Sequence, residues 1–258
     1  MLNRKIDNDI DAHFSNSKKA LFLTGARQVG KTYSIRKYAK RHGLNLIEFN
    51  FLLQPEAMDI INGAGDVKEL LLRISAYSRV PLVRSKTLIF FDEVQECPDV
   101  MTWVKALVDE GSYIYALSGS LLGVELKDIR SVPVGYMSEM QVYPMDFEEF
   151  VRAVGVPENV LDAVKKSWSE KTPVDAYIHE KMMQLFQLYI IVGGMPAAVQ
   201  TYIDSNNIQN VVKEQRDIIN LYKKDIARYD QDVRKKLYIN EVFDLIPSEL
   251  NAKNKRFI

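Results

Sequence analysis

The stretch that most constrains this fold is residues 25–32, GARQVGKT, which match the pattern G-x-x-x-x-G-K-[ST]. An apolar run at 20–23 precedes it and a helical pattern at 33–41 follows it. A strand, a glycine-rich loop and a helix in this order form a P-loop, in which backbone N–H groups and the positive helix end face a phosphate chain. The pattern therefore predicts an α/β fold with a phosphate-binding loop after an early strand.

This loop suggests roles for its individual residues. Gly25 and Gly30 allow a tight turn and a close approach to a ligand. Lys31 would reach the β- and γ-phosphates, and the Thr32 hydroxyl would hold Mg²⁺. The residues expected to hold the nucleotide are Gly25, Ala26, Arg27, Gln28, Val29, Gly30, Lys31, Thr32 and Tyr33. The alternative is a glycine-rich turn that only opens a helix, and the flanking strand and helix argue against it.

A second motif follows another apolar stretch. Residues 87–91, TLIFF, form a continuous apolar run, as in a strand that is buried on both faces of a parallel sheet. Asp92 and Glu93 come directly after it, which is a Walker B pattern. We expect Asp92 to bind Mg²⁺, directly or through water, and Glu93 to orient and polarise the attacking water. An acidic pair can also open a solvated loop, but its place after a P-loop favours catalysis.

A third polar site ends the next predicted strand, at 113–117. Ser118 or Ser120 could hydrogen-bond the γ-phosphate or the attacking water, the sensor 1 role of AAA+ ATPases, and the sequence does not choose between them. The alternative is a plain Ser-Gly-Ser turn. Strands that alternate with helices predict an open parallel sheet covered on both faces, with ligands beyond the carboxyl ends of its strands.

The rest of the chain divides at about 150–156. Before that point we expect a helical lead-in over 1–19 and further strands over 44–51 and 137–143. Residues 53–65 are expected to be rich in turns, and Asp66 to cap the helix that follows them. Residues 121–134 are expected to form helix and loop. Asp146 and Glu149 predict a capping box that opens a helix.

No strand pattern appears after residue 150, so the second part is expected to be all helical. The run at 182–192 is apolar on nearly every side. We therefore expect it to be the central buried helix of this second part.

Composition excludes several classes of protein. Lys+Arg and Asp+Glu are both 34, so no global field draws the chain to nucleic acid, and the basic clusters at 165–166, 223–224 and 234–236 are interpreted as solvated helix faces. The single Cys97 excludes an internal disulfide framework. The three histidines show no metal-ligand spacing. No apolar run reaches the length of a signal peptide or membrane span, so we expect a cytoplasmic protein without a membrane partner.

Six motifs together carry a family resemblance: GARQVGKT, FFDEVQECPD, LSGS, YPMDFEEF, YIIVGGMPAAV and YKKDIARYD. In this order they resemble the bacterial and archaeal AAA-family ATPases that carry a C-terminal domain of unknown function. The resemblance covers essentially the whole chain. It implies a P-loop NTPase parallel sheet flanked by helices, the AAA+ core, followed by a smaller helical lid, and binding of ATP with Mg²⁺.

The expected domains are a lead-in at 1–19, the AAA+ core at 20–155, the lid at 156–230 and a C-terminal start at 231–258. The last segment resembles the beginning of a winged-helix-like region, so the chain is expected to lack the family's C-terminal domain. A second departure is Gly135-Tyr136, where relatives usually have Gly-Arg. If that arginine supports turnover in relatives, this chain would hydrolyse ATP poorly.

The sequence thus predicts an ATP-binding, ATP-hydrolysing protein of the AAA+ type. A nucleotide-gated binding module with little hydrolysis is the alternative, and a P-loop kinase of a small substrate is weaker. A homo-oligomer or a protein partner is compatible with either, and nucleic acid has weak support. An arginine that completes the site could come from a neighbouring subunit. Candidates within the chain are Arg27, Arg130, Arg216 and Arg228.

Overall fold

The computed structural model of the chain describes residues 2–120, 135–229 and 233–251. Its centre is a five-stranded sheet with the strand order β2-β3-β4-β1-β5, in which every pair is parallel. The strands are β1 (Ala20–Gly25), β2 (Asn45–Asn50), β3 (Thr87–Asp92), β4 (Ile114–Ser120) and β5 (Met137–Gln141). β4 lies between β1 and β3, so the three predicted polar sites end three adjacent strands at one edge of the sheet.

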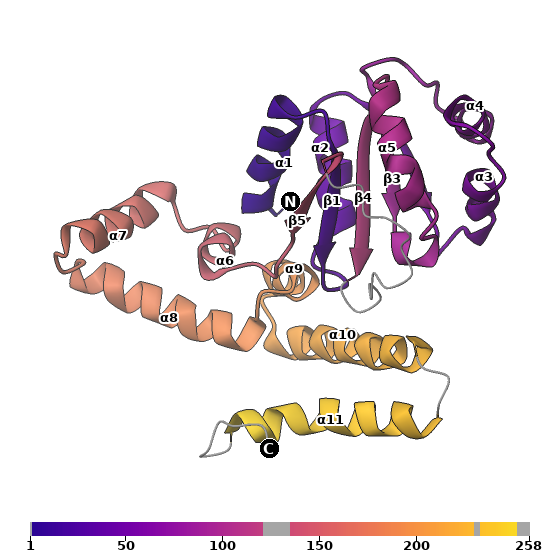
Figure 1. Cartoon of the computed structure of the whole chain (residues 1–258). Helices are drawn as coiled ribbons and strands as arrows, with labels where there is room; N and C mark the ends of the chain where they lie inside the picture. The colour runs from indigo at the N-terminus through magenta and orange to yellow at the C-terminus, as the bar shows by residue number, and fades with distance from the viewer. Residues whose placement is uncertain (1, 121–134, 230–232, 252–258) are drawn as a thin grey trace.

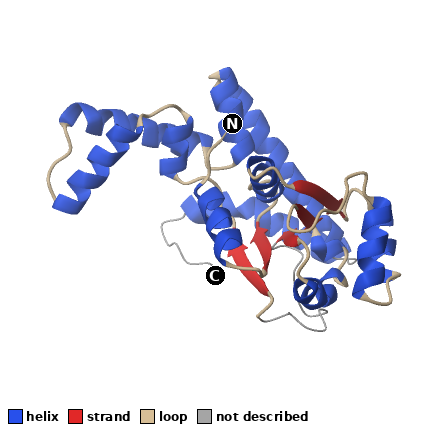
Figure 2. Cartoon of the chain, turned by 90° about the horizontal axis from the view of Figure 1, so that it is seen from above, coloured by secondary structure: helices blue, strands red, loops and turns tan. Residues whose placement is uncertain are grey.

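Helices cover both faces of the sheet, as the apolar strands predicted (Figure 1, Figure 2). In β1, Leu21 and Leu23 face Ile10 and Ile35 in one apolar cluster, whereas Phe22 belongs to the cluster on the opposite face. This alternation follows from the two-residue period of a strand. The first face is covered by α1 (Lys5–Asn16) and α2 (Lys31–Arg41), and the second by α3 (Met58–Asn62), α4 (Val67–Tyr77) and α5 (Val100–Glu110).

Two predicted helix caps are confirmed. The Asp66 side chain accepts from the Glu69 N–H at 2.8 Å and opens α4. Asp146 and Glu149 form the capping box of α6 (Phe147–Ala153). The turn-rich stretch predicted before Asp66 also contains a short 3₁₀ turn, Pro55–Ala57, and α3. The segment predicted as helix and loop over 121–134 lies outside the described residues.

The second part of the described chain contains helices and no strand, as predicted. After α6 come α7 (Glu158–Glu170), α8 (Ala176–Val192), α9 (Pro196–Ser205), α10 (Ile208–Tyr229) and α11 (Val233–Asn251). α6 contributes Phe150 and Val151 to the apolar cluster of these helices, not to the clusters of the sheet. The packing therefore changes before α6, earlier than the predicted boundary at residue 155. At 233–251, where a winged-helix-like start was expected, the structure shows one helix.

The prediction that 182–192 forms a central buried helix is wrong. Within α8 only Val192 is buried, and Met183, Ile190 and Ile191 are exposed. One face of α8 packs against α6 through residues such as Leu185 and Tyr189. α7 and α8 extend away from the sheet (Figure 1), so few elements are available to cover the other faces of this helix.

Among the described helices, none is by itself long and apolar enough to cross a membrane. Taken together, α8 and α9 have the length and apolar composition of a membrane span, but a bend of 119° separates the two helices.

The helices α9 and α10 lie beyond the carboxyl ends of the strands (Figure 1). The arrowheads of β1 and β4 point toward them. The helical half therefore faces the edge of the sheet at which the three predicted polar sites end.

Candidate nucleotide-binding site

The predicted phosphate-binding loop connects β1 to α2 at this edge. Gly25 has φ +144° and Gly30 has φ +102°, conformations that side chains rarely adopt. A Cβ atom at Gly25 would also lie 2.3 Å from the Val142 carbonyl oxygen. Gln28 adopts φ +63° without being a glycine. The loop is thus held in a specific, partly strained shape.

Lys31 occupies the first turn of α2 and is buried. Its Nζ donates to the carbonyl oxygens of Gly25 and Ala26, at 3.0 and 2.9 Å. Burial lowers the pKa of Lys31, while the charges of Glu93 and Asp92 act in the opposite direction. The lysine therefore lies within the field of both predicted Walker B carboxylates.

Asp92 is the centre of the polar cluster and is 1% exposed. Its carboxylate accepts from the Thr32 hydroxyl at 3.0 and 3.1 Å and from the Asn50 amide at 2.9 Å. The Ser118 hydroxyl donates to the same carboxylate. Burial raises the pKa of Asp92, the Ser118 hydrogen bond lowers it, and the Glu93 charge raises it further. One helix and two strands, α2, β2 and β4, thus deliver polar groups to one buried carboxylate on β3.

Glu93 begins a tight turn with φ +59°, an unusual value for a residue with a side chain. Its backbone N–H lies 3.5 Å from the Ser118 hydroxyl oxygen. Its carboxylate accepts from the Gln95 side-chain Nε2 at 2.5 Å, and the Gln95 side-chain Oε1 accepts from the Ser120 backbone N–H at 3.3 Å. Gln95 therefore joins the predicted catalytic glutamate to the end of β4.

The two candidate sensor serines have different surroundings. Both are fully buried. Ser118 contacts Asp92 and Glu93 through its hydroxyl, whereas Ser120 contacts Gln95 through its backbone N–H. The Ser118 hydroxyl thus lies among the Walker B residues.

The oxygen atoms of Thr32 and Asp92 suit a hard cation such as Mg²⁺. Mg²⁺ commonly binds through one or two protein oxygens, with substrate phosphates and water completing its shell. The described residues contain no cluster of three or more His, Cys, Asp or Glu side chains that could hold a metal. Magnesium would therefore depend on the nucleotide as well as on this pair.

A cavity of about 290 Å³ opens beside the loop. Its walls come from three parts of the chain: Leu2, Arg4, Gln28, Gly30, Tyr33, Ser34, Pro196 and Gln200. Tyr33, predicted to hold the nucleotide, is 41% exposed and forms part of this wall. The cavity is mainly apolar and lies next to the predicted phosphate site, which suits a nucleotide base.

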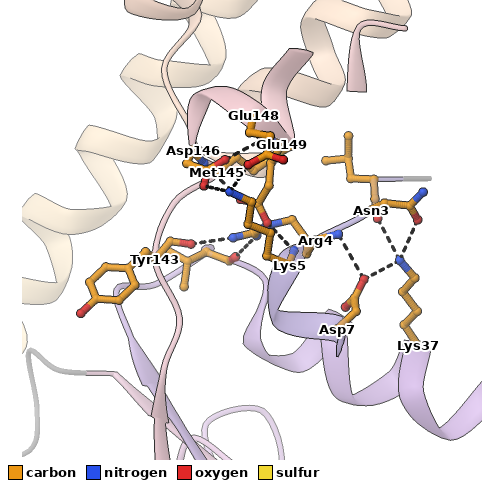
Figure 3. Close-up of polar contacts among 12 residues, drawn as sticks. Asn3, Arg4, Lys5, Asp7, Lys37, Tyr143, Met145, Asp146, Glu148 and Glu149 are labelled. Carbon is orange, nitrogen blue, oxygen red and sulfur yellow. Dashed lines mark hydrogen bonds and ion pairs between the residues drawn. The ribbon is translucent and has the colours of Figure 1, made fainter. Parts of the chain in front are cut away.

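Arg4 ties the start of the chain to this region (Figure 3). Its guanidinium donates to the carbonyl oxygens of Val29 and Tyr143, at 2.9 and 2.7 Å. It also pairs with Glu149 at 3.0 Å, and both side chains are 6% exposed. Arg4 thereby links the P-loop, the lead-in helix and α6.

α10 contacts the P-loop from the helical half. Arg27 Nη1 pairs with Asp225 Oδ1 at 2.6 Å, and the Tyr222 hydroxyl donates to the Arg27 carbonyl oxygen at 2.8 Å. Of the other arginines that could complete a site, Arg216 is exposed. The side chains of Arg130 and Arg228 lie outside the described residues.

Sequence reasoning missed several residues of this region. Asn50 ends β2, and a polar residue at the carboxyl end of a parallel strand was a usable signal. Arg4 and Asp225 had no such signal, because each contacts the P-loop only through the tertiary fold.

Tyr136, at the position where the resemblance led us to expect an arginine, lies at the other edge of the sheet. Its carbonyl oxygen accepts from the Ala20 N–H at the start of β1, and Lys105 Nζ lies 5.4 Å from the centre of its ring. Tyr136 therefore lies at the end of the strands opposite to the cluster around Asp92.

A parallel sheet of this order, with a P-loop after β1 and an acidic pair after β3, defines a P-loop nucleoside triphosphatase fold. The chain belongs to the AAA domain family, whose sequence model matches residues 17–151. It is an ATPase of the AAA type by family. A second model, described as a domain of unknown function, matches residues 183–257. The expectation that a C-terminal domain of unknown function is lacking is thereby corrected. No curated protein matches the chain.

Several solved structures are similar to this chain at low identity. A Walker-type ATPase of Pyrococcus abyssi is 15% identical, with a TM-score of 0.48, over 97% of this chain and 77% of that one. AMPPCP-bound DnaA from Aquifex aeolicus is 12% identical, with a TM-score of 0.44, over 96% and 78%. DNA-bound Drosophila ORC is 12% identical, with a TM-score of 0.44, over 81% and 65%.

Proposed function

We propose that this chain binds ATP with Mg²⁺ at the P-loop and hydrolyses it to ADP and phosphate. The observation that carries the proposal is the convergence of Thr32 and Ser118 on the buried Asp92, with Glu93 next to it. Membership of the AAA domain family supports the nucleotide-binding part.

Each residue has a role in this proposal. The loop amides and Lys31 hold the phosphates, and Thr32 and Asp92 hold Mg²⁺, which would neutralise phosphate charge when bound. Glu93 orients and polarises the attacking water as a general base. Ser118 would respond to the terminal phosphate through its contacts with Asp92 and Glu93, and Ser120 would act through Gln95.

The base of the nucleotide would lie in the cavity between the lead-in segment, α2 and α9. Tyr33 offers an aromatic wall there, and Pro196 and Gln200 come from the helical half. Because one ligand would contact both halves of the chain, bound nucleotide would alter how the halves are held together.

Single-turnover hydrolysis of ATP tests this proposal. We expect Glu93→Gln to bind ATP and to cleave it about 100-fold more slowly or worse, since the general base is lost. Lys31→Ala should bind ATP poorly. Glu96→Gln and Lys40→Ala are matched controls, because each makes the same change at a nearby position outside the cluster. Equal cleavage by Glu93→Gln and wild type would refute the assignment of the base.

The second candidate is a nucleotide-gated module with little or no hydrolysis. It is favoured by one contact, the 2.5 Å hydrogen bond from Gln95 that engages the Glu93 carboxylate. If this bond keeps Glu93 from water, wild type binds ATP without cleaving it and Gln95→Ala cleaves it. If wild type cleaves ATP in a single turnover, the module is excluded as the main function.

We further propose that a second copy or a protein partner, in preference to nucleic acid, responds to the nucleotide state. Lys165, Lys166 and Lys223 each form an ion pair with an acidic residue of this chain, which weakens the case for a basic binding face. Sedimentation with ATP, with ADP and with added DNA or RNA distinguishes the candidates. A complex that forms with nucleic acid alone would reverse this order.

A further inference from the structure

The contact between α10 and the P-loop carries an inference about how the site is regulated. Arg27 and Asp225 are 8% and 3% exposed and are joined by the 2.6 Å ion pair. Tyr222 and Asp225 are three residues apart, so they lie on one face of α10 and reach the loop together. Within the described residues, α10 thus holds the loop by one charged and one neutral contact.

The ion pair leaves one nitrogen of Arg27 and one oxygen of Asp225 without a hydrogen bond among the described residues. Among the described residues, Arg27 Nε and Asp225 Oδ2 are buried and have no hydrogen-bond partner. Arg4, by contrast, uses Nε and both terminal nitrogens in hydrogen bonds. A buried pair joined by one contact has donor and acceptor capacity left for another ligand.

The Arg27 guanidinium also acts on the predicted phosphate site. Lys31 Nζ donates to the carbonyl oxygen of Ala26, the residue that directly precedes Arg27 in the loop. The two cations therefore share one field, and a polyphosphate bound at Lys31 would attract Arg27 as well. Asp225 neutralises Arg27 and repels that polyphosphate.

We infer that Arg27 has two alternative anionic partners, Asp225 and the terminal phosphate of ATP, so that ATP binding releases α10 from the P-loop. The inference rests on the proposed binding of ATP at this loop. A buried carboxylate that loses its cationic partner is strongly destabilising. When Arg27 turns to the phosphate, Asp225 must therefore reach water, and α10 must move.

Nucleotide affinity gives the first test. Asp225→Asn removes the competing charge, so ATP should bind roughly 3- to 30-fold more tightly. ADP lacks the terminal phosphate, and its affinity should change much less. Asp225→Glu keeps the charge, and Tyr222→Phe removes only the neutral contact, so both should retain the wild-type ratio of ATP to ADP affinity.

The position of α10 gives the second test, and this test leaves Asp225 intact. Spin labels are placed on Lys224→Cys and Asp109→Cys, two exposed positions on α10 and α5, while the buried Cys97 stays unlabelled. A non-hydrolysable ATP analogue should shift the distance distribution between the labels, and ADP should leave it near that of the free chain.

The outcomes separate this inference from the proposed function. If wild type binds neither ATP nor ADP, the proposed function fails and the inference fails with it. If wild type binds ATP but Asp225→Asn leaves the ATP to ADP ratio unchanged or lowers it, only the inference is overturned. An unchanged label distance with the ATP analogue would overturn it as well.

Discussion

The sheet half and the helical half of this chain bury their apolar side chains to very different degrees. All six residues of β1 and of β3 are buried. In the seventeen residues of α8, only Val192 is buried. A central strand has neighbours on both edges and helices on both faces, whereas a helix buries only the faces that meet a partner. An apolar run in the sequence therefore predicted burial correctly for the strands of the sheet half, but not for α8 in the helical half.

The largest expected effect separates the cores of the two halves. Phe91 is 1% exposed and its ring lies 5.6 Å from that of Phe49. Phe91→Ala should lower the free energy of unfolding by about 4 kcal/mol, because the buried cavity cannot be filled. Phe186 on α8 is 40% exposed, so Phe186→Ala should cost about 1 kcal/mol or less. Urea unfolding measures both, and equal losses would contradict the comparison.

An intermediate effect is expected at the joint between the halves. Arg4→Met would leave the buried Glu149 carboxylate without its guanidinium partner (Figure 3). The expected loss of stability is about 3 kcal/mol. The double variant Arg4→Met with Glu149→Gln removes both charges and should recover part of that loss. Thermal unfolding of the single and double variants gives the coupling energy between the two changes. If the two losses of stability simply add, the ion pair between Arg4 and Glu149 is not the cause of the loss.

The smallest effect is expected on the surface of α6. Hydrogen bonds from Lys165 and Lys5 are the main causes that lower the pKa of Glu148 to about 2. A carboxylate whose pKa is lowered by folding stabilises the fold at pH values above its ordinary pKa of 4.5. This stabilisation is lost as the pH falls toward 2. The side chains of Lys5 and Lys165 are 47% and 54% exposed, and water screens their charges. Glu148→Gln should therefore cost only about 0.5 kcal/mol at pH 7. The loss of stability caused by Glu148→Gln should become smaller as the pH is lowered from 5 to 2. A loss that becomes larger on acidification would contradict this prediction.

The parts of the fold that the sequence could predict are those set by local pattern. The run 87–91, the loop around Lys31 and the cap at Asp66 each depend on neighbouring residues, and the structure has the corresponding strand, loop and cap. The expected chemical roles of Lys31, Glu93 and the two serines stay predictions, since geometry alone does not test them.

The remainder depends on contacts between distant residues. Whether α8 is buried depends on how many helices pack around it, which its own apolar pattern does not encode. Arg27 and Asp225 are 198 positions apart in the chain, and neither has a local signal that names the other. Asn50 could have been selected by its place at the end of a strand, but its contact with Asp92 follows from the strand order.

The most direct test of the central claim is the Mg²⁺ dependence of ATP binding, measured by calorimetry with Mg²⁺ and with a chelator. The claim is that the Thr32 and Asp92 cluster is the metal–nucleotide site. Thr32→Val removes the hydroxyl at nearly constant volume, and Thr102→Val is the matched control on α5. We expect Mg²⁺ to strengthen ATP binding by wild type and by the control, and Thr32→Val to lose most of that gain. A Thr32→Val variant with the full Mg²⁺ effect would contradict the account.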